Sequence, residues 1–224
     1  MNSDLPKVLH PLKGRPLILH VVGSLQEAGV TDITVVVGYK GESVLSVLPG
    51  NVKHVWQREQ LGTGHAVMQA EDVLSGFQGK VIIACGDVPL IKPVTFKRLI
   101  EESQAETTGA AVLTMDIETP AGYGRIVKDN NGRFQRIVEE KDASPEERLI
   151  NEVNTGTYVF EKDFLFAGLK KLNTNNAQKE YYLTDALRHV VDSGFNVKTV
   201  LLENSLEGSG VNAPDELLSL ENSL

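Results

Sequence analysis

The chain has 224 residues, of which 41% are hydrophobic and 23% charged, and this composition is that of a globular rather than a disordered protein. Lysine and arginine number 22 against 30 aspartates and glutamates, so the net charge of −8 argues against nucleic acid as the main partner. The single cysteine permits no internal disulfide, and no run approaches the roughly 18 apolar residues of a membrane span.

The N-terminal segment, MNSDLPKVLH, lacks the charged and apolar regions of a signal peptide, so we expect a cytoplasmic protein without a membrane partner. An apolar strand normally opens an α/β domain, and we interpret the polar start of this chain as a missing first strand. Leu17, Val21 and Leu25 then recur at helical spacing, and Gly29 marks the end of that helix.

Short apolar runs rich in β-branched residues alternate with helical patterns along the chain. Such runs are typical of strands buried on both faces, as in a parallel sheet covered by helices. The runs are Ile33–Val37, Val81–Cys85, Ala110–Met115, Thr157–Phe160 and Val197–Leu202. Helical spacing is found at Phe96–Ile100 after Pro93 and at Leu183–Val191 before Gly194. The alternation predicts a Rossmann-like, doubly wound and mostly parallel α/β sheet.

One region departs from this rhythm. Between Gly122 and Glu140, two alternating segments flank Asn130-Asn131-Gly132, which is a turn sequence typical of β-hairpins. We therefore expect an antiparallel hairpin that leaves the main sheet.

A glycine-containing loop, QREQLGTG, lies between the probable strand Val52–Trp56 and the helical stretch His65–Val73. Glycines at such a junction let backbone N–H groups approach a ligand, and the amides of Gln57 and Gln60 can bind the edge of a nucleobase. The alternative interpretation is an ordinary tight turn between a strand and a helix.

Asp87 follows the apolar strand in Cys85-Gly86-Asp87-Val88-Pro89. A carboxylate at the carboxyl end of a buried strand points into the crevice where open α/β sheets bind ligands, and with water and phosphates it can hold Mg²⁺. A turn or helix-capping aspartate is the alternative. Cys85 fits a core residue better than a nucleophile.

Lys7, after Pro6, can meet a phosphate as a point charge, although most lysines are simply solvated. Glu139 and Asn154 follow the hairpin region, and such a carboxylate and amide suit the hydroxyls and amide of a sugar. The alternative for the charged run around Glu139 is a solvated face. For Thr184 and Asp185 it is capping of the following helix, and for a neighbouring tyrosine core packing.

The sequence also speaks against several other chemistries. Its five histidines have no HxH or HExxH spacing, and we find neither GxSxG nor GxxxxGK[ST]. We therefore expect no zinc site, no serine hydrolase and no Walker-type ATPase.

Taken in order, SDLPKVLHPLKGRPL, EQLGTGHAV, GDVPL, GYGRI, VEEKDA, NTG, EYYLTD and Val211-Asn212 carry a family pattern. The chain resembles the N-terminal uridylyltransferase domain of the bacterial bifunctional N-acetylglucosamine-1-phosphate uridylyltransferase / glucosamine-1-phosphate acetyltransferases. The resemblance implies that UTP and N-acetylglucosamine 1-phosphate are joined, with Mg²⁺, into UDP-N-acetylglucosamine and pyrophosphate. That product serves bacterial cell-wall peptidoglycan synthesis.

The resemblance also implies roles for individual residues. Lys7 would contact the nucleotide phosphates, and Asp87 and Asn212 would bind Mg²⁺. The nucleoside would be held by residues of two loops, which are Gln57, Gln60, Gly62, Thr63, Cys85 and Gly86. The N-acetylglucosamine part would be held by Gly124, Glu139 and Asn154, with Tyr182 and Thr184 nearby.

Two departures from the family pattern shape the expectations. The family opens with a strand and the phosphate-wrapping loop LAAGxGTRM, which this chain lacks, so the resemblance implies weak or absent activity and lowered stability. The family's C-terminal hexapeptide-repeat β-helix is also absent, so we expect a single domain over residues 1–224, no acetyl transfer and a monomer. The alternatives are a non-catalytic remnant that binds UDP-sugars, and a related nucleotidyltransferase with another sugar phosphate or NTP.

Overall fold

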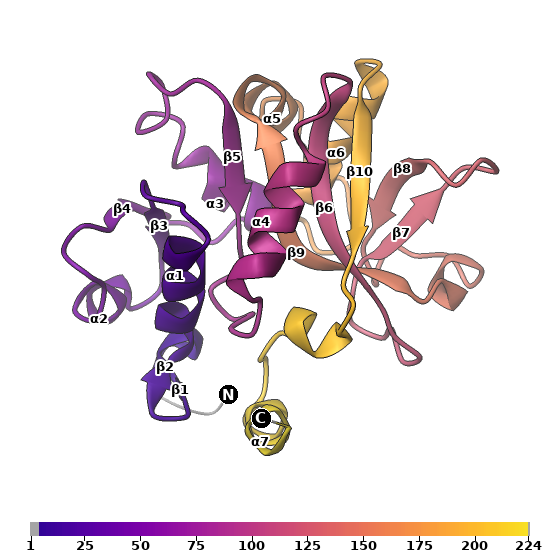
Figure 1. Cartoon of the computed structure of the whole chain (residues 1–224). Coiled ribbons are helices and arrows are strands. Elements are labelled where there is room, and N and C mark those ends of the chain that lie inside the picture. The colour runs from indigo at the N-terminus through magenta and orange to yellow at the C-terminus, as the bar shows by residue number, and fades with distance from the viewer. Residues whose placement is uncertain (1–4, 224) are drawn as a thin grey trace.

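The computed structural model describes residues 5–223, which form a three-layered α/β structure (Figure 1). The expected missing strand concerns the chain before Leu5, which lies outside the described residues. Among these residues the largest sheet has the strand order β10-β6-β9-β7-β8, and β5 also pairs with β9. Its strands are β5 (Lys80–Ile83), β6 (Thr108–Asp116), β7 (Arg125–Lys128), β8 (Phe134–Val138), β9 (Glu152–Glu161) and β10 (Asn196–Leu201).

The strand directions confirm the mostly parallel sheet and the antiparallel hairpin. The hairpin does not leave the main sheet as expected, because β7 also pairs with β9 and so extends it. Strand β10 pairs with β6 in parallel. Strand β9 runs against β6 on one side and against β5 and β7 on the other, so β5, β6, β7 and β10 share one direction. The predicted hairpin is β7–β8, which pair antiparallel around a turn where Gly132 has a φ of +77°.

A separate parallel pair, β3 (Thr34–Val37) and β4 (Lys53–Trp56), lies on the β5 side of the large sheet in Figure 1. Within residues 5–223 no ladder joins β3 to β5, so each has one unpaired edge. All four residues of β5 are half-buried. Ile82, Ala84 and Cys85 nevertheless pack against one apolar core, and Val81 and Ile83 pack against the other, so the run is covered on both faces as expected. Strands with free edges are prone to pair with other chains.

Helices cover both faces of the large sheet. One face carries α1 (Leu17–Glu27) and α4 (Pro93–Glu102), and the other carries α5 (Lys162–Leu169) and α6 (Thr184–Asp192) (Figure 1). The apolar positions predicted for α1 are the ones it buries, and the chain turns at Gly29, whose φ is +97°. Each face therefore has its own apolar core against the sheet.

Two short helices, α2 (Gly41–Leu45) and α3 (Thr63–Met68), flank β4. The helix expected at His65–Val73 begins two residues earlier and ends at Met68. Beyond that point the amides of Ala70 and Glu71 bond three residues back, so the chain continues in tight turns.

The two ends of the described chain meet beside the sheet. The first turn, η1 (Lys7–Leu9), leads into the small hairpin β1 (Pro11–Leu12) and β2 (Arg15–Pro16). At the other end, η3 (Ser205–Gly208) leads into α7 (Pro214–Asn222), which lies at the same end of the molecule as β1–β2 (Figure 1). A small apolar cluster joins these segments, and its buried members are Leu12, Leu17, Val211 and Leu220.

A last short turn, η2 (Glu147–Leu149), precedes β9. Within residues 5–223, no helix is both long and apolar enough to cross a membrane.

The core under α6 gives a stability prediction. Leu187 is fully buried, so Leu187→Ala should lower the free energy of unfolding by about 2–5 kcal/mol through lost burial and a residual cavity. The matched control is Leu218→Ala on α7, where the side chain is 59% exposed and little change is expected. Denaturant unfolding followed by circular dichroism measures both, and equal losses would contradict the assignment of the core.

Candidate functional site

The charged end of the site joins three distant parts of the chain. The Lys7 Nζ forms an ion pair with Asp87 and donates a hydrogen bond to Asn212 Oδ1 at 3.0 Å. Lys7 comes from η1, Asp87 from the loop after β5, and Asn212 from the segment between η3 and α7. The backbone N–H of Val211 donates to the carbonyl of Asp87 at 2.9 Å, which fixes the register of this meeting.

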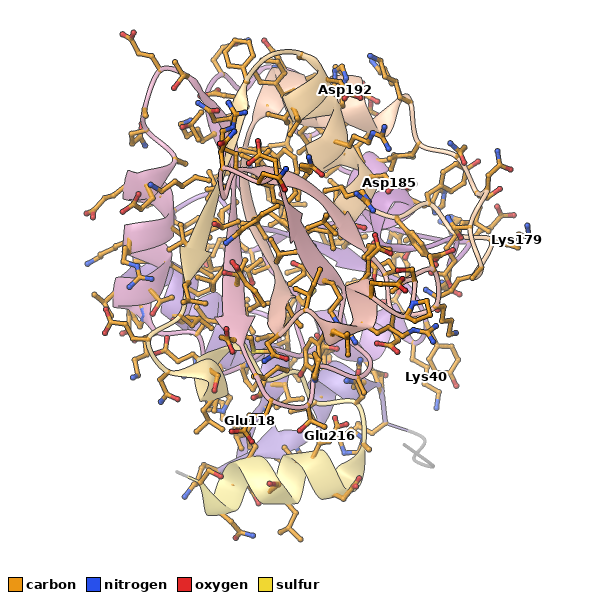
Figure 2. The ribbon with its side chains drawn as sticks, turned by 90° about the vertical axis from the view of Figure 1, so that its right-hand side faces the viewer. Lys40, Glu118, Lys179, Asp185, Asp192 and Glu216 are labelled. Carbon is orange, nitrogen blue, oxygen red and sulfur yellow. The ribbon has the colours of Figure 1, made fainter. Side chains whose placement is uncertain are left out.

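Further polar groups hold this end in place. The carboxylate of Glu216, on the side of α7 that faces the sheet (Figure 2), accepts hydrogen bonds from the N–H groups of Asn212 and Ala213. Tyr123 also lies here. Burial raises the pKa of its phenol, the charges of Glu216 and Asp87 add to the rise, and a hydrogen bond with the Gly210 backbone opposes it. Sequence reasoning missed Tyr123, although it sits inside the quoted GYGRI motif.

The residues of this end fit a hydrated magnesium ion. Asp87 supplies a carboxylate and Asn212 an amide oxygen, and both oxygens already contact one cationic nitrogen, so they lie close enough to share an ion. Mg²⁺ takes few protein oxygens and completes its shell with water and phosphates. Within residues 5–223, here included, no three or more His, Cys, Asp or Glu gather in a way that could hold a metal ion.

The predicted sugar-binding residues fall into a second group. Glu139 Oε1 accepts a hydrogen bond from the Thr184 hydroxyl at 2.9 Å. A Cβ added to Gly124 would lie 2.8 Å from Ile137 and 3.3 Å from Glu139 Oε2, so only glycine leaves this room. Asn154, on β9, donates to the Tyr158 hydroxyl at 2.7 Å and accepts from the Gly156 N–H at 3.0 Å.

The pKa values of two adjacent glutamates are shifted in opposite directions. Burial raises the pKa of Glu139, and the nearby charges of Asp185 and Asp142 raise it further against the hydrogen bond from Thr184. Glu140 instead has a lowered pKa because Arg125 hydrogen-bonds and pairs with it. Arg125 is only 2% exposed, so this ion pair anchors the hairpin next to Glu139.

The loop predicted to bind a nucleobase is tightly held. Gln57 Nε2 donates to the Gly62 carbonyl at 3.0 Å and lies 3.2 Å from the ring nitrogen Nδ1 of His65. Gln60 Nε2 donates to the Gln57 carbonyl at 3.2 Å. Gly62 has a φ of +107°, and a Cβ there would lie 2.7 Å from the Tyr181 carbonyl, so glycine is required on both grounds.

The segment before α6 links the loop to the sugar-binding residues. Thr63 Oγ1 accepts a hydrogen bond from the Leu183 N–H at 3.1 Å, and the next residue, Thr184, donates to Glu139. Tyr182 donates from its hydroxyl to Asp142 at 3.1 Å, and burial raises its pKa to about 12. Figure 2 labels Lys179 and Asp185, which bracket this segment.

The same segment contributes an aromatic contact that the sequence did not reveal. The ring of Tyr181 stacks on that of His65, with centroids 6.2 Å apart and planes at 30°. In the sequence, only the tyrosine pair before α6 and the histidine after the glycine loop could have indicated this stacking. We expected core packing for one tyrosine, and the buried Tyr182 fits that expectation.

Cys85 and Gly86 lie in the loop after β5 and are packed against neighbouring segments. The Cys85 thiol donates to the Gly156 carbonyl at 3.4 Å, and burial raises its pKa to about 12, so it is a protonated packing residue and no nucleophile. Gly86 lies against α1, where an added Cβ would meet Ile18 at 2.9 Å.

The contacts of three residues bear on the alternatives left open by the sequence. Lys7 and Asp87 form an ion pair with each other, and the Lys7 side chain stays 39% exposed. The N-cap of α6 is Leu183, without a side-chain cap, and the Thr184 hydroxyl bonds Glu139 instead.

The glycine loop follows β4 and Asp87 follows β5, so both lie at the carboxyl ends of strands, where open α/β sheets bind ligands. Residues 2–205 match the family described as nucleotidyl transferase, and the chain belongs to that family.

Its curated relatives are bifunctional GlmU proteins. The chain is 44% identical over 212 residues to the protein of Oceanobacillus iheyensis, covering 95% of this chain and 47% of that protein. It is 46% identical over 221 residues to the protein of Pelotomaculum thermopropionicum, covering 99% and 48% respectively. The resemblance seen in the sequence is thus confirmed, and the chain spans about half the length of these relatives.

A solved structure confirms the fold. The crystal structure of UDP-glucose pyrophosphorylase complexed with UDP-glucose superposes with a TM-score of 0.78 at 19% identity. The match covers 98% of this chain and 90% of the other.

Replacing Glu139 and replacing Glu140 should change the stability of the fold in opposite directions at neutral pH. Because the folded-state pKa of Glu139 is above its ordinary 4.5, the stability of the wild type falls as pH rises through that raised value. Glu139→Gln should therefore be more stable than wild type at neutral pH and lose that advantage towards pH 4.5. Glu140→Gln should be less stable at neutral pH, and its deficit should shrink below 4.5, since the Glu140 pKa is lowered. Urea unfolding across this range measures both, and the same sign for the two variants would contradict the electrostatics.

Proposed function

We propose that this chain, as a single domain over residues 1–224, transfers a uridylyl group from UTP to N-acetylglucosamine 1-phosphate and releases pyrophosphate. The observation that carries the proposal is the meeting of Lys7, Asp87 and Asn212 at one point of the fold. The names of the relatives at 44% and 46% identity support it. We further propose that it works as a cytoplasmic monomer.

The chemistry is an in-line displacement. A phosphate oxygen of the sugar phosphate attacks the α-phosphorus of UTP, a new P–O bond forms, and the bond from the α-phosphorus to the oxygen bridging the β-phosphate breaks. The protein needs no covalent nucleophile, which agrees with the protonated, buried thiol of Cys85. Its residues position the two substrates and offset negative charge.

The charged end serves the phosphates. Asp87 and Asn212 would hold a magnesium ion, which when bound supplies Lewis-acid neutralisation of phosphate oxygens. The ammonium group of Lys7 is positively charged like the magnesium ion. Its side chain is 39% exposed, so it can reach a phosphate.

The uncharged parts of the site serve recognition. Gln57, Gln60, Gly62 and Thr63 form the loop proposed to hold uracil, with Cys85 and Gly86 along the nucleoside. The sugar would lie against Gly124, Glu139, Asn154, Tyr182 and Thr184. A carboxylate that is partly buried accepts hydrogen bonds from sugar hydroxyls strongly, since water competes little there.

Removal of the Asp87 charge tests the reaction. Asp87→Asn should lower kcat at least about 10²-fold in a pyrophosphate-release assay with UTP and N-acetylglucosamine 1-phosphate, because a preorganised charge at the phosphates is lost. Asp192→Asn, on the outer surface of α6 (Figure 2), is the control of equal charge change and should match wild type. Calorimetric binding of UDP-N-acetylglucosamine without turnover would favour a binding protein, and turnover of another sugar phosphate or NTP a related transferase.

The hydroxyl of Thr184 tests sugar recognition. Thr184→Val keeps the buried volume but leaves Glu139 without its donor, so KM for the sugar phosphate should rise about tenfold while KM for UTP stays unchanged. Thr184→Ser keeps the hydroxyl and should stay near wild type. Steady-state kinetics with each substrate varied in turn measures this, and an equal rise in both KM values would contradict the assignment.

A further inference from the structure

The ammonium of Lys7 occupies a special position among the proposed metal ligands. It pairs with Asp87 and donates to Asn212 Oδ1 at 3.0 Å, so a single cationic nitrogen contacts both oxygens that the magnesium ion would need. The side chain of Asp87 is 20% exposed in this arrangement. The nitrogen therefore sits where a cation bound by these two oxygens would sit.

The ammonium and a divalent ion cannot hold this position together. A magnesium ion lies about 2.1 Å from its oxygen ligands, so an ion shared by Asp87 and Asn212 would overlap or closely approach the present position of Nζ. Two cations at such a distance repel each other strongly. Metal binding by both residues therefore requires Lys7 to move away.

The surroundings explain why a resident cation is needed. Besides Asp87, the carboxylate of Glu216 lies here and accepts from the Asn212 N–H. Both negative charges act on the half-buried phenol of Tyr123. The Asp87 side chain is only 20% exposed, so its charge would be poorly solvated without a counter-charge. Lys7 supplies that charge, and its 39% exposed, flexible side chain has a route outwards.

We propose that Lys7 is a built-in stand-in for the metal ion: it holds Asp87 and Asn212 together in the metal-free protein and is displaced when the metal enters. The displaced ammonium becomes available to the nucleotide phosphates. This inference rests on the proposed function, because it takes the metal and phosphate positions from it. It adds that Lys7 lowers the affinity for free metal and that metal and phosphate binding are coupled.

Metal binding without nucleotide tests the idea directly. The probe is Mn²⁺, whose free concentration is measured by electron paramagnetic resonance during titration of the full chain. Lys7→Gln should bind Mn²⁺ about tenfold more tightly than wild type, since the competing charge is gone. The control is Lys53→Gln, which removes the same charge from the exposed pair with Asp32 and should leave the affinity unchanged.

A double substitution tests whether the gain in Mn²⁺ affinity arises at Asp87. If Lys7 competes at Asp87, the tighter Mn²⁺ binding of Lys7→Gln should be lost in Lys7→Gln/Asp87→Asn. Circular dichroism melts show whether each variant is folded. Equal Mn²⁺ affinity of wild type and Lys7→Gln, absence of measurable binding in both, or an equal gain in Lys53→Gln would overturn the proposal.

The proposed function is judged separately by calorimetry of UDP-N-acetylglucosamine with the wild type. Nucleotide-sugar binding without a Mn²⁺ gain in Lys7→Gln refutes the stand-in and leaves the function intact. A Mn²⁺ gain without nucleotide-sugar binding supports the stand-in and counts against the function.

Discussion

The hydrogen bond from the Val211 amide to the Asp87 carbonyl ties the C-terminal segment to the loop after β5. It works together with the apolar cluster of Leu12, Leu17, Val211 and Leu220, which packs the first and last described segments against each other. A single bond of this kind is worth little alone, and the buried leucines supply most of the free energy. The charged end of the site exists only because this contact brings residues some two hundred positions apart together.

The rest of the site depends on a second set of contacts around β9 and α6. Strand β9 carries Asn154 and pairs with strands on both sides, so its side chains have a rigid support. Arg125 and Glu140 fix the hairpin beside it, and this places Glu139 under the Thr184 hydroxyl. Asn154 and Thr184 lie on a strand and a helix, and Glu139 directly follows β8, so these polar groups have firm support, which suits reactions governed by positioning.

Much of this arrangement could be predicted from the sequence. The apolar runs gave most strands to within a few residues, because burial requires apolar side chains wherever the chain crosses the core. Asn130-Asn131-Gly132 located the hairpin turn, since few residues adopt the positive φ of Gly132. The predicted position of Asp87 after an apolar strand agrees with the structure, in which Asp87 lies in the loop after β5.

Other features depend on partners that a single sequence does not name. The donor to Glu139 is Thr184, which local rules favour as a helix cap, and a tertiary hydrogen bond overrides that preference. The end of α3 at Met68 was missed because its following turns carry ordinary helix-forming residues. Tyr123 and the stacked pair of Tyr181 and His65 were missed because aromatic residues are equally at home in a core.

The interlock between Gly62, Thr63 and the residues before α6 has a consequence for engineering and divergence. Gly62 lies against the backbone of Tyr181, and Thr63 accepts a hydrogen bond from the Leu183 N–H. The two loops are therefore complementary in shape and in hydrogen bonding. If the glycine loop alone were grafted from a related protein with a different nucleotide preference, it would no longer fit the segment before α6. The smallest exchangeable unit is both loops together, and evolutionary changes in the two should arrive as a pair.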